Sequence, residues 1–131
     1  METGSTPQKT ILIIDDDPQI RSMLHTAFKH QGYQIFEANN GLDGLKLIQE
    51  HNFCCVITDL KMPQMDGLKL IEQLQKIPAI EDGHCHIIAY SNVAQDYVIQ
   101  EVEKKGTTKL LLKDETTPSQ LVEIVNKLIS K

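Results

Sequence analysis

The segment Ile11-Leu12-Ile13-Ile14-Asp15-Asp16-Asp17-Pro18 decides the fold class of this chain. Four consecutive apolar residues are typical of a strand that is buried on both faces of a parallel sheet. Three acids follow directly, and Asp17 before Pro18 predicts a helix cap with proline at the first helical position. The segment therefore predicts a buried strand that passes through an acidic turn into a helix.

Four more segments predict the remaining strands of the sheet. Cys54–Thr58, Ile87–Tyr90 and Leu110–Leu112 are short apolar runs, which are typical of strands buried on both faces. Tyr33–Phe36 predicts a fifth strand that is more exposed.

Helical patterns lie between these strands. Apolar residues at helical spacing follow Pro18, and Thr117 to Gln120 predicts a capping box for a C-terminal helix. Weaker patterns predict helices over Leu42–Glu50, Gly67–Lys76 and Val93–Lys105. Strand followed by helix, repeated in this way, predicts an α/β fold with a doubly wound parallel sheet and right-handed crossovers.

The length of 131 residues predicts a single domain over 9–131, preceded by a short polar segment, 1–8, that we expect to be disordered. A formal net charge of −5 argues against direct nucleic-acid binding, because phosphate contacts need an excess of Lys and Arg. No apolar run approaches the ~20 residues that a membrane helix needs. The sequence therefore predicts a cytoplasmic protein that does not contact membranes.

The three cysteines, Cys54, Cys55 and Cys85, lie in or beside apolar runs. We interpret them as buried free thiols in a reducing compartment. His84 and His86 flank Cys85, but no paired Cys-x-x-Cys spacing supports a metal site there.

Polar residues follow four of the predicted strands, at the edge where doubly wound sheets bind ligands. They are Asp15-Asp16-Asp17, Asp59, Ser91-Asn92 and Lys113-Asp114. Acids gathered at one edge would repel each other unless a divalent cation lay between them, and oxygen ligands favour Mg²⁺. A carboxylate beside such a cation can attack a phosphoryl group. Asp17, and Asp66 before Gly67, are instead expected to be helix caps.

At these residues the chain resembles the receiver domain of two-component response regulators. Asp59-Leu60-Lys61-Met62-Pro63-Gln64-Met65-Asp66-Gly67 resembles the phosphoacceptor loop of that family, and Ile11–Pro18 and Ile87–Ser91 resemble its first and fourth strands. The resemblance implies a flavodoxin-like (βα)5 fold with strand order 2-1-3-4-5. It also implies that the chain is a phosphoacceptor and not an enzyme. Such a phosphoacceptor catalyses at most its own phosphorylation and dephosphorylation.

The resemblance assigns the site residues one by one. Asp59 would accept the phosphoryl group from a histidine kinase or phosphotransfer protein. Asp16 would ligate Mg²⁺ directly together with Asp59, Asp15 would act through water, and Lys61 would contribute its backbone carbonyl. Two further residues would contact the acceptor and then the phosphoryl group: Lys113, and the swinging hydroxyl of Ser91.

Three positions depart from the family pattern. Asp114 stands where a proline usually follows the lysine, so we expect a trans peptide bond there. Leu110 replaces the aromatic residue that often acts as a rotamer switch. Tyr90 is a candidate substitute, although we interpret it as a structural tyrosine. Asn92 is larger than the usual residue, and either caps the next helix or narrows access to the phosphoryl group.

Two alternative functions stay open at this point. One is a phosphorylation-independent receiver-like interaction module. The other is a metal-dependent phosphatase that forms an aspartyl phosphate. The motif of those enzymes has a second Asp two residues after the nucleophile, and Lys61 at that position disfavours this function. No output segment follows the last predicted helix, so the chain is either a stand-alone regulator or the receiver of a larger protein. It would act on a downstream protein target, and the resemblance implies homodimer formation through the face built from Val93–Lys105, Leu110–Leu112 and the C-terminal helix.

Overall fold

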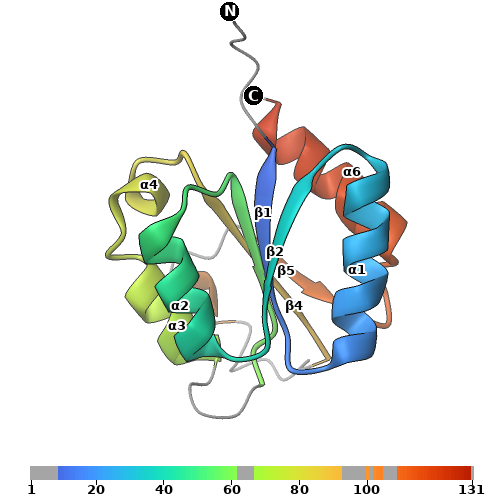
Figure 1. Cartoon of the computed structure of the whole chain (residues 1–131). Coiled ribbons are helices and arrows are strands. Elements are labelled where there is room, and N and C mark those ends of the chain that lie inside the picture. Colours follow the sequence, from blue (N-terminus) through green and yellow to red (C-terminus); the bar gives the residue numbers. More distant parts are fainter. Residues whose placement is uncertain (1–8, 62–66, 93–99, 101, 105–108, 131) are drawn as a thin grey trace, which may run out of the picture.

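A computed structural model describes residues 9–61, 67–92, 100, 102–104 and 109–130 of the chain. Its centre is one sheet of five parallel strands in the order β2-β1-β3-β4-β5 (Figure 1). The strands are β1 (Thr10–Ile14), β2 (Gln34–Ala38), β3 (Cys55–Thr58), β4 (His86–Ser91) and β5 (Lys109–Leu112). The predicted fold class and strand order are confirmed.

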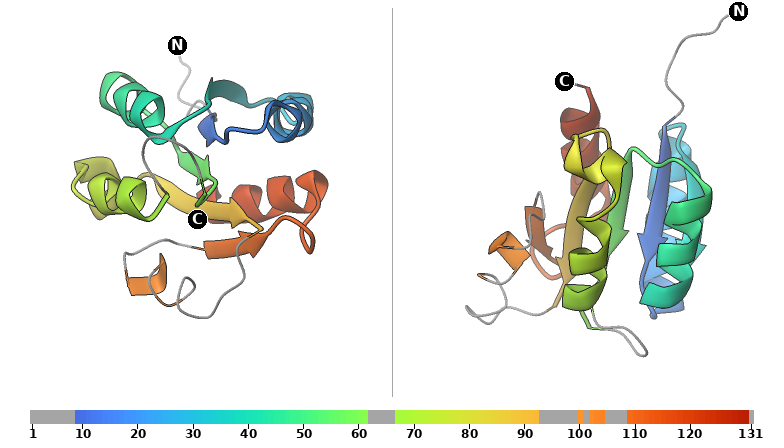
Figure 2. Two further views of the ribbon diagram at one scale, coloured as in Figure 1. Left: turned by 90° about the horizontal axis from the view of Figure 1, so that it is seen from below. Right: turned by 90° about the vertical axis from the view of Figure 1, so that its left-hand side faces the viewer.

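Helices cover both faces of the sheet, as the views along and across the strands show (Figure 2). The helices α1 (Pro18–His30) and α6 (Pro118–Ile129) lie on one face, and α2 (Gly41–Glu50) and α3 (Gly67–Leu74) lie on the other. A short helix, α4 (Pro78–Glu81), precedes β4. None of the described helices is long and apolar enough to cross a membrane.

The core is divided by the sheet into two apolar clusters, because successive side chains of a strand point to opposite faces. Ile11 and Ile13 of β1 pack with Phe28 of α1, whereas Leu12 and Ile14 pack in the other cluster with α2 and α3 residues. All five residues of β1 are buried. The strand β1 is therefore fixed from both faces, which in turn fixes the acidic turn that follows it.

The capping predictions at two helices are confirmed. The Asp17 side chain accepts a hydrogen bond from the Gln19 amide at 2.9 Å, and Pro18 occupies the first turn of α1. Thr117 and Gln120 form a capping box at the start of α6. The predicted cap at Asp66 lies outside the described residues.

Three predictions of local structure need correction or stay open. Leu110–Leu112 is only half-buried, because β5 is the edge of the sheet rather than an interior strand. The helix predicted over Gly67–Lys76 ends at Leu74, and α4 follows separately with Pro78 in its first turn. Of the helix predicted over Val93–Lys105, the structure describes only residues 100 and 102–104, which are helical.

Candidate functional site

Strand pairing brings two acidic residues to adjacent positions at the carboxyl edge of the sheet. Ile14 of β1 pairs with Thr58 of β3, and Asp15 and Asp59 are the residues that follow. The Asp59 amide donates to the Ile14 carbonyl at 2.9 Å, so the ladder extends one residue past the strand. The position of Asp59 beside Asp15 is therefore set by backbone hydrogen bonds rather than by loop conformation.

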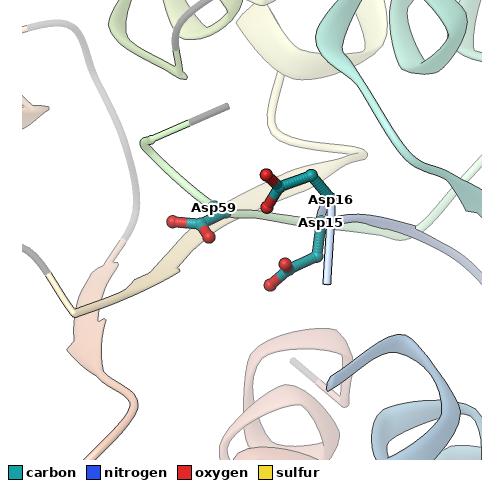
Figure 3. A group of neighbouring side chains, drawn as sticks. All are labelled: Asp15, Asp16 and Asp59. Carbon is teal, nitrogen blue, oxygen red and sulfur yellow. The ribbon is translucent and has the colours of Figure 1, made fainter. Parts of the chain in front are cut away.

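The carboxylates of Asp15, Asp16 and Asp59 lie together at this edge (Figure 3). One oxygen from each lies within 4.8 Å of the others, and within the described residues no second group of this kind occurs. Asp15 is 2% exposed and Asp59 8% exposed, whereas Asp16 is open to solvent. The structure thus brings together three acids that the sequence analysis placed on two strand ends.

The ammonium group of Lys113 bridges two of these acids. Its Nζ lies 2.8 Å from Asp15 Oδ2 and 2.9 Å from Asp59 Oδ2. Burial alone would lower the pKa of Lys113, but hydrogen bonds and attraction to the two carboxylates outweigh it and raise the pKa. Burial raises the pKa of Asp15, because its desolvation exceeds the opposing effect of Lys113. Lys113 is therefore a firmly protonated donor at neutral pH.

The other oxygen of the Asp59 carboxylate accepts three hydrogen bonds. The Leu60 amide donates to Oδ1 at 2.7 Å, the Lys61 amide at 3.2 Å, and the Ser91 hydroxyl at 2.9 Å. Ser91 is completely buried, and its hydroxyl is directed at the Asp59 carboxylate. Both oxygens of Asp59 are thus held in fixed directions, which orients the carboxylate for chemistry.

The residues fit a small divalent cation. The candidate side-chain ligands are all carboxylate oxygens, the type that Mg²⁺ prefers. Asp15 already accepts from the Asp17 amide and from Lys113. Asp16 makes no side-chain hydrogen bond or ion pair with another described residue, so no donor occupies its carboxylate oxygens.

One residue at the site was not anticipated from the sequence. Arg21 of α1 donates from a guanidinium nitrogen to the Asp15 carbonyl oxygen at 2.7 Å. A usable signal exists, since Arg21 is the only arginine in the chain and lies one helical turn after the Asp17 cap. One arginine among many lysines indicates a position where the planar geometry of the guanidinium matters more than its charge.

The structure shows the surroundings of Tyr90 and of two positions that depart from the family pattern, Leu110 and Asp114. The hydroxyl of Tyr90, which is 4% exposed, donates to the Thr116 carbonyl. Leu110 is half-buried against the cluster on the α2 and α3 face. Asp114 is exposed, and no cis peptide bond occurs in the described part of the chain, so the bond after Lys113 is trans. The cap predicted for Asn92 concerns a helix start outside the described residues.

The cysteines are free thiols, with Cys55 and Cys85 buried and Cys54 half-buried. Burial raises the pKa of Cys85 to about 12. Among the described residues, Asp15, Asp16 and Asp59 form the one group that could hold a metal ion. Cys85 and its neighbouring histidines do not form such a group.

The fold and the site together define a doubly wound α/β domain of the receiver class. The chain belongs to the response regulator receiver domain family of two-component systems, whose model matches residues 11–126.

A curated protein that is similar to this chain is a transcriptional regulator. The transcriptional regulatory protein SrrA of Staphylococcus aureus is 29% identical over 98 residues, which are 69% of this chain and 41% of that protein. The chain thus spans less than half the length of this curated relative.

Solved structures agree on the fold. A CheY-like receiver domain protein from Methanospirillum hungatei has 25% identity and a TM-score of 0.86, with 94% of each chain covered. The receiver domain of Francisella response regulator 1452 has 27% identity and a TM-score of 0.82, covering 94% of this chain and 98% of that one. The chemotaxis response regulator CheY4 of Vibrio cholerae has 23% identity and a TM-score of 0.83. The match covers 92% of this chain and 98% of that one, and it supports the fold alone.

Proposed function

We propose that this chain accepts a phosphoryl group on Asp59 in a Mg²⁺-dependent reaction and thereby switches a protein-interaction surface. The donor would be a phosphohistidine of a histidine kinase or of a phosphotransfer protein. The observation that carries the proposal is the Asp59 carboxylate itself, which is nearly buried, held by four donors, and adjacent to two more acids.

The reaction is an in-line displacement at phosphorus. A carboxylate oxygen of Asp59 forms the new P–O bond while the P–N bond to the donor imidazole breaks. The bonding electron pair leaves with the imidazole nitrogen, which takes up a proton. The product is an acyl phosphate on Asp59 and a neutral histidine on the partner.

The metal ligands we propose are the carboxylates of Asp16 and Asp59, with Asp15 acting through water and Lys61 through its backbone carbonyl. When bound, Mg²⁺ would offset the negative charge of the phosphoryl oxygens. The donor set supports this assignment, since three carboxylates with only one neighbouring ammonium leave excess negative charge.

Lys113 and Ser91 would pass from the carboxylate to the phosphoryl group. A phosphoryl group adds up to about two negative charges and three acceptor oxygens at one point. Lys113 Nζ and Ser91 Oγ each already contact a different oxygen of Asp59, so both donors stand within reach. Any displacement of Ser91 is carried directly into β4, of which it is the last residue.

The alternative, a receiver-like module that works without phosphorylation, has less support. Such a module has no need of a buried lysine between two carboxylates, an arrangement that costs desolvation energy. Keeping the full set of acids, lysine and hydroxyl in contact is more readily explained by phosphoryl transfer.

The test is incubation with acetyl phosphate and Mg²⁺ followed by intact-mass measurement. We expect one added phosphoryl group on the wild-type protein, loss of the addition in Asp59→Asn, and loss with a chelator. Asp82→Asn, an exposed acid outside the site, is the matched control and should be modified like the wild type. A wild-type protein that gains no phosphoryl mass under these conditions would favour the interaction module.

A further inference from the structure

Arg21 joins three parts of the structure around the acidic turn. Its side chain is 20% exposed, and its guanidinium contacts both the Asp15 carbonyl at 2.7 Å and the Glu37 carboxylate at 3.3 Å. Glu37 belongs to β2, and its second oxygen lies 2.7 Å from His25 Nδ1. The guanidinium is therefore held by the turn that follows β1 and by β2 at once.

The contact to Asp15 completes the anchoring of that residue's backbone. The Asp15 amide donates to the Ala38 carbonyl of β2 at 3.1 Å, and its carbonyl accepts from Arg21. The Asp15 carbonyl belongs to the same planar peptide unit as the Asp16 amide. Fixing this carbonyl therefore fixes the direction in which the chain enters Asp16.

Asp16 needs such support more than the other two acids do. Asp15 and Asp59 are buried, and their carboxylates are held by several donors. The Asp16 carboxylate is exposed and has no side-chain partner among the described residues. Its location relative to Asp59 consequently depends on the backbone that carries it.

Charge alone does not explain an arginine at this position. A positive group beside a cation site weakens cation binding by simple repulsion. The geometry does explain it, because a guanidinium presents several donors in a rigid plane and reaches a carbonyl and a carboxylate together, whereas an ammonium group is a point donor on a flexible stem.

We propose that Arg21, supported by Glu37, is a positioning residue that sets the Asp15–Asp16 peptide so that Asp16 can ligate a divalent cation beside Asp59. This inference rests on the proposed function, because it concerns the same metal site. Arg21 itself contacts neither the cation nor the phosphoryl group in this proposal; it acts through the backbone.

The test is calorimetric Mg²⁺ titration of the wild type, Arg21→Lys and Arg21→Gln. We expect both variants to bind Mg²⁺ about tenfold more weakly, as is typical when support of a ligand is removed. If Arg21 contributed only charge, Arg21→Lys would match the wild type and Arg21→Gln would bind more tightly, and that pattern overturns the proposal. Lys29→Gln, which removes one exposed positive charge from the last turn of α1, is the matched control and should not weaken binding.

Two further measurements separate positioning from a general loss of structure. In the metal-free protein, the Asp16 amide resonance should shift in both Arg21 variants, whereas amides of β4 should not. With acetyl phosphate, the Mg²⁺ concentration for half-maximal phosphorylation should rise about tenfold, while the rate at saturating Mg²⁺ stays within about twofold. An equal fall of the rate at all Mg²⁺ concentrations would contradict a positioning role.

Glu37→Ala keeps the proposal testable if the Arg21 variants fold poorly, because it removes the support of the guanidinium while Arg21 itself stays in place. Weaker Mg²⁺ binding in this variant supports the proposal, and unchanged binding overturns it. The proposed function fails separately: a wild-type protein that binds no Mg²⁺ rejects the metal site, whereas wild-type binding with unaltered variants rejects only the role of Arg21.

Discussion

Lys113 and Asp59 are 54 residues apart in the chain, yet Lys113 Nζ lies 2.9 Å from Asp59 Oδ2. The same ammonium group lies 2.8 Å from Asp15 Oδ2, so one cation holds the ends of β1, β3 and β5 together. Lys113 is the positive charge that allows two buried carboxylates to be neighbours.

Removing that charge should destabilise the metal-free protein. We expect Lys113→Met to lower the free energy of unfolding by about 3 kcal/mol, because two largely buried carboxylates lose their common partner. Mg²⁺ should restore more stability to this variant than to the wild type, since it supplies the missing charge. Urea unfolding with chelator and with Mg²⁺ measures both effects. Lys109→Met, an exposed lysine of the same strand, is the control, and equal stability of the two variants would contradict the prediction.

Asp16 and Asp17 offer a matched pair for the metal site. Asp16→Asn should weaken Mg²⁺ binding at least about tenfold through loss of a charged direct ligand, with little change in the thermal unfolding midpoint because Asp16 is exposed. Asp17→Asn removes the same charge one residue further on but keeps a good helix cap. Its Mg²⁺ affinity should stay close to that of the wild type. If both variants lost affinity equally, a general charge effect would replace the ligand role.

A substitution at Tyr90 tests whether this residue is structural or moves to transmit the response to phosphorylation. Tyr90→Phe should cost about 1 kcal/mol of stability through the lost hydrogen bond to the Thr116 carbonyl. The chemical-shift changes that follow phosphorylation should nevertheless persist, because the hydroxyl already has a partner in the unphosphorylated protein. Tyr33→Phe, which loses a hydroxyl contact to Asn126 on the far helix, is the comparison. Persistent stability combined with a lost response in Tyr90→Phe would identify a relay.

The buried thiols give a prediction for alkaline pH. Burial raises the pKa of Cys85 from 9.0 to about 12 and that of Cys55 well above 9.0. The unfolded chain therefore releases these protons at a lower pH than the folded one, so the thiols reduce stability only as the pH rises above 9.0. At mildly alkaline pH, this difference in pKa means that the folded protein has roughly 1000-fold less thiolate at Cys85 than the unfolded chain has. Iodoacetamide should label Cys85 rapidly only after denaturation, and rapid labelling of the native protein would contradict this.

The sheet was predictable because its inner strands are continuous apolar runs that only a two-sided core can bury. Leu110–Leu112 looks the same in sequence, but its position at the edge of the sheet leaves it half-buried. Strand order decides that difference, and local sequence does not contain it. The break between α3 and α4 did leave a signal, since Pro78 disfavours a helical conformation at Ile77.

The acidic edge was predictable for a related reason: parallel strands place their carboxyl ends side by side. The sequence does not reveal which side chains then touch. That Lys113 reaches Asp15 as well as Asp59, and that Arg21 reaches the Asp15 carbonyl, depends on the tilt of the neighbouring segments, on which residue spacing carries no information.

The most direct test of the central claim locates the phosphoryl group by chemistry. Borohydride reduces an acyl phosphate to an alcohol, which would convert a phosphorylated aspartate into homoserine. After treatment with acetyl phosphate and Mg²⁺, reduction and proteolysis, tandem mass spectrometry should find homoserine at position 59 and aspartate at positions 15, 16 and 17. Homoserine at another acidic position, with aspartate intact at 59, would contradict the assignment of Asp59 as the acceptor.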